Sequence, residues 1–361
     1  MKRFRFIELV AVIVCGFLDW QQAQAQRWIN YTLTEGLPSL DITAVAEDDH
    51  YGIWIGTYFS GLSRFDGREW TSYSQAEGHA LSSDLITCLL KDQGGDMWIG
   101  TYDNGCSRVD PERELKDPSV WRNHNFASTN GGLVDNQINA LLEDRAGNLW
   151  FGTRGGISIA AARAVVQHEL LSQRDTWEII FTPGLFDTVV YALAEDTLGN
   201  IWVGTSSGAY RYNPKNRAAI GEWTYDVALE GAEVRALFVD HIGDIWLGRY
   251  GSQRGDVMRF PTMNPALRDS FDVATDVFAI VEDRDQKIWF GTLGDGVFVV
   301  EPASDLHQRK NWKQFQEAQD GLASNSIKDF MHGSEGDLWV ATAGGGVSRL
   351  DYSWRNFAPV V

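Results

Sequence analysis

A tryptophan recurs along the 361-residue chain at a nearly constant interval, in a nearly constant setting. Seven tryptophans begin the tetrapeptides WIGT, WIGT, WFGT, WVGT, WLGR, WFGT and WVAT, and successive copies lie 44, 52, 52, 44, 43 and 50 residues apart. Self-similarity with a period of about 40–50 residues indicates a repeat architecture rather than a mixed globular fold. The seven copies are Trp54, Trp98, Trp150, Trp202, Trp246, Trp289 and Trp339.

Each repeat contains four short segments with the character of β-strands. In the first repeat these are residues 42–47, 53–57, 61–65 and 70–73, which are rich in β-branched and aromatic residues and are separated by turns such as Asp66-Gly67. Asp48 begins the first turn, where its carboxylate can accept backbone N–H groups. Four strands in each of seven repeats predict an all-β fold, a seven-bladed β-propeller of four-stranded antiparallel blades.

The repeated tryptophan is expected to be part of the scaffold. Seven equivalent positions are better explained by packing between blades than by ligand contact, because large apolar side chains are usually buried. The glycine two residues later, present in six copies, is expected to let neighbouring backbones approach closely.

Two segments compete to close the ring. Residues 28–31 (WINY) and 354–357 (WRNF) both resemble the fourth strand of the first repeat, WTSY at 70–73. We favour the N-terminal segment as the outer strand of the seventh blade, because a strand contributed across the chain ends leaves no free sheet edge.

Residues 1–25 have the pattern of a signal peptide. Lys2, Arg3 and Arg5 precede a short apolar run, and Ala23-Gln24-Ala25 resembles a cleavage site. The sequence therefore predicts a propeller domain at 26–361 that is periplasmic or secreted, and it shows no second apolar segment that would span a membrane in the mature chain.

Charge and cysteine content exclude some functions. The formal net charge of −18 argues against nucleic acid or an anionic membrane surface as partner. Cys88 and Cys106 fall on the first and third strands of one blade, roughly 10 Å apart and beyond disulfide reach. We therefore predict two free, buried thiols. A long connection at 161–175 favours a short surface helix.

The repeat resembles that of the two-component regulator propellers. Residues 141–153 read LLEDRAGNLWFGT, residues 320–327 read DGLASNSI, and residues 337–339 and 345–351 read DLW and GGVSRLD. The resemblance covers nearly all of residues 27–357. It implies a periplasmic sensor that responds to a ligand, often a polysaccharide fragment, and a histidine-kinase system as signalling partner. Such sensors usually carry a second propeller, a further domain, a membrane helix and a kinase, which this sequence does not show.

The search for reactive groups gives no catalytic residue, no metal site and no cofactor. None of the seven histidines forms a pair with metal-ligand spacing, and no nucleophile elbow is present. The residues that follow the Thr of each repeat, between the second and third strands, do vary on the fixed frame, which favours a binding surface. The predicted ligand-binding residues are Tyr58, Phe59, Tyr102, Asp103, Arg154, Arg249, Tyr250, Arg254 and Asp295.

Three functions remain open at this point. The first is a non-enzymatic sensor that binds a carbohydrate or another small extracytoplasmic ligand, since aromatic faces suit sugar rings and arginine suits carboxylates or sulfates. The second is a propeller lyase acting on a glycan or a cyclic ester, as in the similarly sized virginiamycin B lyase. The third is a protein-interaction scaffold. The sequence favours the first.

Overall fold

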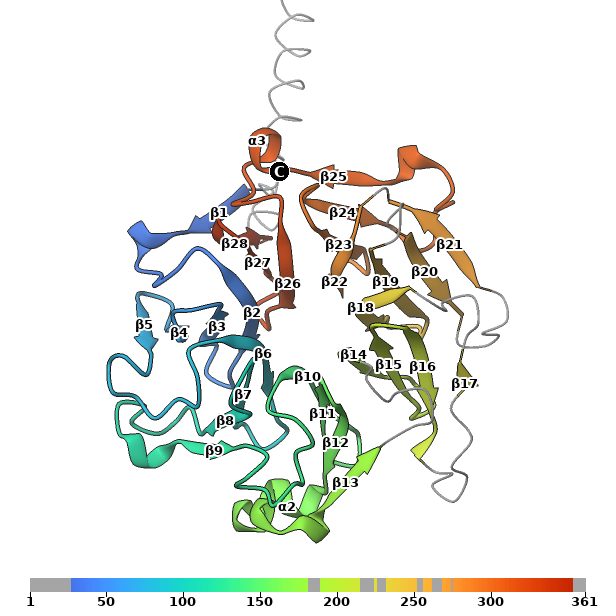
Figure 1. The fold of residues 1–361 in the computed structure, drawn as a ribbon. Coiled ribbons are helices and arrows are strands. Elements are labelled where there is room, and N and C mark those ends of the chain that lie inside the picture. The colour runs from blue at the N-terminus through green and yellow to red at the C-terminus, as the bar shows by residue number, and fades with distance from the viewer. Residues whose placement is uncertain are drawn as a thin grey trace, which may run out of the picture.

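The chain forms a ring of seven four-stranded antiparallel sheets around a central axis (Figure 1). The computed structural model describes residues 27–180, 189–214, 224–225, 232–251, 256–261, 268–273 and 275–352. The predicted fold class is confirmed.

Blade 1 consists of β2 (Ile42–Glu47), β3 (Ile53–Thr57), β4 (Leu62–Phe65) and β5 (Trp70–Tyr73); blade 2 of β6 (Ile86–Lys91), β7 (Met97–Thr101), β8 (Cys106–Val109) and β9 (Arg122–His124); blade 3 of β10 (Ile138–Glu143), β11 (Leu149–Thr153), β12 (Gly156–Ala160) and β13 (Trp177–Ile180); and blade 4 of β14 (Val190–Glu195), β15 (Ile201–Thr205), β16 (Gly208–Tyr212) and β17 (Thr224–Tyr225). Blade 5 consists of β18 (Glu233–Val239), β19 (Ile245–Tyr250), β20 (Asp256–Phe260) and β21 (Asp269–Asp272); blade 6 of β22 (Val277–Glu282), β23 (Ile288–Thr292), β24 (Val297–Val300) and β25 (Lys313–Phe315); and blade 7 of β26 (Ile327–His332), β27 (Leu338–Thr342), β28 (Gly346–Asp351) and β1 (Arg27–Tyr31).

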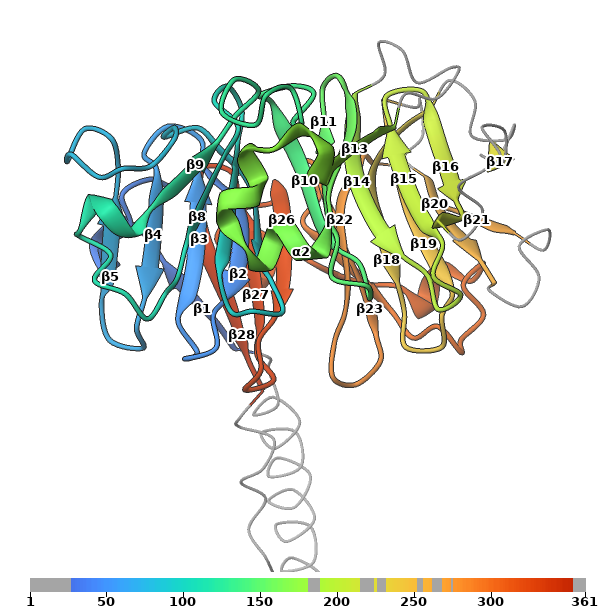
Figure 2. The same ribbon diagram turned by 90° about the horizontal axis from the view of Figure 1, so that it is seen from below.

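The strand order separates the loops into two faces. The first strand of each blade is innermost, and its start pairs with the end of the second strand, as Ile42 does with Thr57. The loops between second and third strands therefore share one face of the ring with the loops that lead into the next blade (Figure 2). We call this the b–c face. The turns between first and second strands lie on the opposite face, the a–b face.

The repeated tryptophan is buried between blades, as predicted. Trp54 has no exposed surface and belongs to a core cluster with Ile86 and Ile99 of blade 2. Its indole Nε1 donates to Oδ2 of Asp48 at 2.8 Å. The same contact recurs at 2.7–3.1 Å between the Asp and Trp of blades 2 to 6, and each of these aspartates also accepts backbone N–H groups of its turn with Oδ1. The Asp six residues before the Trp therefore ties the turn to the core.

The glycine after the tryptophan brings each second strand against the next blade. A Cβ on Gly56 would lie 2.4 Å from Cγ2 of Ile86, and one on Gly291 would lie 2.5 Å from Cγ2 of Ile327. Real Cβ atoms do not approach other atoms so closely, so a side chain here would push the blades apart. The expected close approach is confirmed.

The N-terminal strand closes the ring, as predicted. β1 pairs antiparallel with β28, with Trp28 opposite Leu350. The Trp28 ring packs edge-on against Trp289 at 6.3 Å and Phe315 at 5.9 Å between centroids, both in blade 6. The rival segment 354–357 lies outside the described residues.

The connection at 161–175 contains less α-helix than the sequence favours. Only α2 (Ala162–Val166) is α-helical, and the 3₁₀ turns η3 (His168–Ser172) and η4 (Arg174–Thr176) follow it. Ala164, Val165 and Leu171 are buried in the core cluster that contains Trp98. The expected short surface helix is therefore present as α2, with Val166 exposed and these apolar side chains packed inward, while the rest of the connection is 3₁₀ or irregular. The remaining short helices are η1 (Leu33–Glu35), η2 (Pro118–Val120), η7 (Arg309–Asn311) and α3 (Glu317–Asp320).

Cys88 and Cys106 carry free thiols, with β7 between them. Cys88 and Cys106 both pair with Gly100, from opposite sides. Cys106 is fully buried, whereas Cys88 on the innermost strand is only half-buried, which corrects the prediction for that thiol. Burial raises the pKa of the Cys88 thiol to about 12 and also raises the pKa of Cys106.

Two further predictions concern residues that lie outside the described part of the chain. Residues 1–26 include the expected signal peptide, and 252–255 include Arg254. Within the described ranges, no helix has the length and apolar character needed to cross a membrane.

Candidate ligand-binding face

Aromatic side chains stand exposed on the b–c face at the predicted positions. Tyr58 is 44% exposed, Phe59 69% and Tyr102 47%. The rings of Tyr58 and Phe59 lie edge to face with their centroids 4.3 Å apart. Large aromatic rings exposed close to one another are uncommon on a monomer surface unless they serve binding.

Three of the predicted residues line one open depression of about 430 Å³ between blades 2 and 3. Tyr102 and Asp103 come from the loop after β7, and Arg154 from the loop after β11. Arg154 donates to Oδ2 of Asp135 through Nε at 3.2 Å and Nη2 at 3.1 Å. We call this hollow the blade 2–3 depression; its lining is Tyr102, Asp103, Phe126, Val134, Asp135, Asn136, Gln137 and Arg154.

The loop that leads from blade 2 into blade 3 supplies most of this lining and is fixed by its own hydrogen bonds. The Asn136 side-chain oxygen accepts the Phe126 backbone N–H at 2.7 Å, and the Asn136 carbonyl accepts Gly105 N–H at 2.8 Å. Gly131 takes a positive φ of 76°, which glycine adopts without strain. The backbone that carries the Phe126 ring, which is 52% exposed, is therefore held in place by the loop itself. The sequence reasoning missed Phe126 because it considered only the loops after each Thr.

Seven β-bulges form a second ring of variable residues nearer the axis. The pairing of first and second strands shifts register by one residue at the start of every first strand, for example between Ile42 and Ala44. A bulge leaves one residue unpaired and re-aims its side chain. The bulged residues, which we call the bulge ring, are Thr43, Thr87, Asn139, Tyr191, Arg235, Phe278 and Lys328.

In blades 1 to 3 the bulged residue joins its blade to the next one. Thr43 Oγ1 donates to the Ile86 carbonyl at 2.8 Å, and Thr87 Oγ1 donates to the Ile138 carbonyl at 2.5 Å. Asn139 Nδ2 donates to the carbonyl of Val190 at 2.9 Å. This arc of the bulge ring therefore stabilises the contact between neighbouring inner strands.

In blades 4 to 7 the bulged residues are instead large, aromatic or cationic. The Arg235 guanidinium carbon lies 4.4 Å from the ring centroids of both Tyr191 and Tyr250 and 5.1 Å from that of Phe278. The Lys328 Nζ lies 4.5 Å from the same Phe278 ring. We call these five residues the cationic arc. Its chemistry differs from that of blades 1 to 3, although the backbone is the same.

Burial and neighbouring charges shift the pKa values of two side chains in the cationic arc. Arg235 Nε is bonded to the Glu233 carboxylate. Burial, and then the nearby Glu233 charge, raise the pKa of Tyr191. Burial, and then the Arg235 charge, lower the pKa of Lys328, against the opposing effect of Asp41. The two cations therefore repel each other in a partly desolvated setting.

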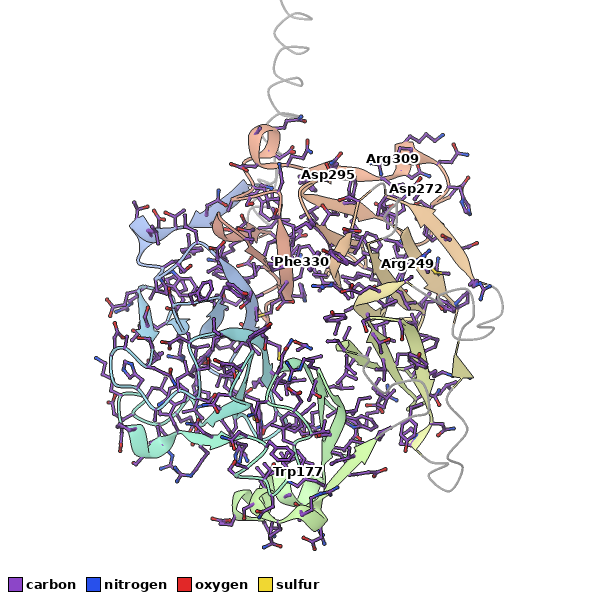
Figure 3. The ribbon with its side chains drawn as sticks, in the orientation of Figure 1. Trp177, Arg249, Asp272, Asp295, Arg309 and Phe330 are labelled. Carbon is purple, nitrogen blue, oxygen red and sulfur yellow. The ribbon has the colours of Figure 1, made fainter. Side chains whose placement is uncertain are left out.

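Of the remaining predicted residues, one belongs to the cationic arc and two lie outside it. Tyr250 is a member, and Arg249 precedes it in β19, opposite Val234. Asp295 lies on blade 6, where its backbone carbonyl accepts from Gln314 Nε2 at 2.8 Å; Figure 3 shows it farther from the axis than Phe330. The sequence reasoning missed Tyr191, Arg235, Phe278 and Lys328. The available signal was the residue after the first Ile or Val of each first strand, which reads T, T, N, Y, R, F, K around the ring.

The two histidines on the a–b face belong to turns between first and second strands. His50 and His241 lie there, and His241 Nδ1 bonds to the Glu282 carboxylate of the next blade. Among the described residues, no three His, Cys, Asp or Glu side chains are grouped as metal ligands.

The fold and the b–c face define a seven-bladed propeller with a regular scaffold and an unsymmetrical set of residues on one face. The family model of the two-component regulator propeller matches residues 36–59, 80–103, 132–155, 184–207 and 273–294. The chain therefore contains repeats of the two-component regulator propeller. The comparison with curated proteins gives no significant match.

Solved propellers share this architecture at low sequence identity. The extracellular domain of a putative hybrid two-component system from B. thetaiotaomicron superposes with a TM-score of 0.71 at 16% identity, over 90% of this chain and 42% of that one. A second such domain from the same organism gives 0.66 at 17%, over 91% and 40%. Virginiamycin B lyase from Staphylococcus aureus gives 0.64 at 12%, over 90% and 97%. The chain thus spans less than half of the two-component relatives, and these identities show the fold alone.

Proposed function

We propose that this protein is a ligand-binding sensor propeller that recognises a carbohydrate or another small extracytoplasmic ligand on its b–c face. We further propose that residues 1–25 direct its export to the periplasm or outside the cell, and that it acts with a histidine-kinase system. The family and the extracellular two-component domains with the same fold support this assignment.

The observation that carries the proposal is the lining of the blade 2–3 depression. Tyr102 and Phe126 offer exposed rings, against which the apolar face of a sugar can pack. Asp103, Asp135 and Arg154 offer acceptors and donors for hydroxyl groups beside those rings. The depression thus combines two aromatic rings with charged and amide side chains, a composition that suits a ligand with many hydroxyl groups.

Calorimetric titration with a panel of neutral oligosaccharides tests the proposal. Tyr102→Ala and Phe126→Ala should each weaken binding about tenfold, as truncation of an anchoring aromatic does at binding sites. Tyr51→Ala is the matched control, because Tyr51 is 62% exposed on the a–b face. The proposal fails if no glycan binds, or if all three variants bind as the wild type does.

The lyase alternative rests only on the shared fold, at 12% identity. No observation on the described residues favours it over ligand binding, so we do not propose an enzymatic activity.

A further inference from the structure

The bulge ring has one function in blades 1 to 3 and a different composition in blades 4 to 7. A short Thr or Asn at this position suffices to bond the carbonyl of the next blade, as in Thr43, Thr87 and Asn139. Tyr191, Arg235, Phe278 and Lys328 occupy the same bulge without being needed for the backbone geometry, because blades 1 to 3 form it with smaller residues. The scaffold therefore does not account for the cationic arc.

Two cations in the arc lie against one ring. Arg235 and Lys328 both contact Phe278, at 5.1 and 4.5 Å from its centroid, and the chain places Phe278 between them in blade order. Three aromatic rings surround the Arg235 guanidinium and restrict its motion. Like charges held this close in a partly buried setting cost energy, and an anion between or above them would relieve that cost.

We propose that the cationic arc is a second binding site on the b–c face, and that it takes a small ligand with a single carboxylate. The Lys328 ammonium and the Arg235 guanidinium would bind the carboxylate through charge-assisted hydrogen bonds. The Phe278 ring would pack against the apolar part of the ligand next to its carboxylate.

The local and overall charges select one carboxylate over a polyanion. Glu233 already compensates Arg235 through its bond to Nε, and Asp41 acts on Lys328. The site therefore has little surplus positive charge, and the formal net charge of −18 repels a multiply charged ligand. A single carboxylate gains the direct contacts at a smaller electrostatic cost.

The test is a calorimetric titration of the protein with benzoate and glucuronate, with benzyl alcohol and glucose as their uncharged counterparts. At least one carboxylate should bind, and its counterpart should bind at least about tenfold more weakly, since a hydrogen bond to a charged group contributes about 1.5–3 kcal/mol. Inorganic sulfate and phosphate serve as rival oxyanions and should bind more weakly than the carboxylate.

Lys328→Thr is the decisive variant, because Thr is the residue of blades 1 and 2 at this bulge and can bond the Ile42 carbonyl of the next blade. It should keep the melting temperature and lose carboxylate binding about tenfold or more, whereas Lys328→Arg should retain it. If Lys328→Thr does not fold, Lys328→Met keeps the packing on Phe278 and removes the charge. Tyr102→Ala should leave carboxylate binding unchanged, which separates this site from the blade 2–3 depression. The proposal is overturned if neither carboxylate binds, if Lys328→Thr or Lys328→Met binds it as the wild type does, or if sulfate or phosphate binds as tightly.

Discussion

Asp144 accepts the indole N–H of Trp150 at 2.9 Å while it also accepts the backbone N–H groups of Ala146 and Asn148. One carboxylate thus fixes both the turn between two strands and the orientation of the ring that packs between blades. The equivalent pairs of blades 1 to 6 repeat this contact, and Gly333 takes the place of the Asp in blade 7. The most constant residues of the repeat therefore build the scaffold, and the proposed ligand-binding residues are among those that vary.

Removing this carboxylate should destabilise the fold. Asp144→Ala leaves a buried indole N–H and two turn N–H groups without their acceptor, at a cost of about 1–3 kcal/mol for each buried unsatisfied group. We expect a free energy of unfolding in urea lower by at least about 2 kcal/mol. Asp175→Ala, at an exposed position of η4, is the control and should change it by less than about 0.5 kcal/mol. Equal effects of the two substitutions would contradict this role of Asp144.

Because the N-terminal strand closes the ring, substitutions of Trp28 and Trp354 should have unequal effects on stability. Trp28→Ala removes a ring that packs on Trp289 and Phe315, and large-to-small changes of this kind cost about 3–5 kcal/mol in a core. Trp354→Ala changes the rival segment and should cost far less. Thermal unfolding measured by circular dichroism compares the two variants. A larger loss of melting temperature for Trp354→Ala would show that the C-terminal segment closes the ring.

Asp329 should make stability depend on pH. Its carboxylate accepts the Val45 N–H at 3.0 Å across the closing junction of blades 7 and 1. Burial raises the pKa of Asp329 to about 7. A raised carboxyl pKa means that the folded state holds the proton more tightly than the unfolded state does. Protonated Asp329 therefore stabilises the fold fully below about pH 4, and this stabilisation is lost as the pH rises through about 7.

Asp329→Ala tests this dependence, because Ala occupies the equivalent position in five other blades, at Ala44, Ala140, Ala192, Ala236 and Ala279. The fall in unfolding free energy between pH 5 and pH 8, on the order of 2 kcal/mol for this group in the wild type, should become smaller in the variant. The Cys88 thiol has its pKa near 12 and stays neutral over this range. An unchanged pH slope in Asp329→Ala would contradict the assignment.

The two thiols should be unreactive in the folded protein. Burial raises the pKa of both Cys88 and Cys106, and the thiolate is the reactive form. Dithionitrobenzoate at pH 8 should modify neither thiol within minutes under native conditions and should modify both in guanidinium. Rapid modification of the native protein would show that the inner strand of blade 2 opens more readily than its burial indicates.

The sequence determines the scaffold because the scaffold repeats. The Trp frame located all seven blades, WINY at 28–31 identified the closing strand, and the glycine after each Trp predicted the close approach of blades. The Asp–Trp hydrogen bond was not foreseen, because the six-residue spacing was explained by the turn alone.

The candidate binding face was only partly predictable from sequence. Tyr102, Asp103 and Arg154 follow the Thr of their repeats and do meet in one depression. Phe126 comes from a loop of another kind, and the bulge ring depends on a register shift that an alternating pattern does not reveal. Asp295 also follows the Thr of its repeat but lies apart from the depression, because it belongs to blade 6 and not to blades 2 and 3.

A crystal structure of the protein with the tightest-binding oligosaccharide of the panel tests the central claim most directly. We predict sugar density in the blade 2–3 depression, with one ring against Tyr102 or Phe126 and a hydroxyl bonded to Asp103, Asp135 or Arg154. Sugar bound on the a–b face, or on the b–c face away from these residues, would contradict it.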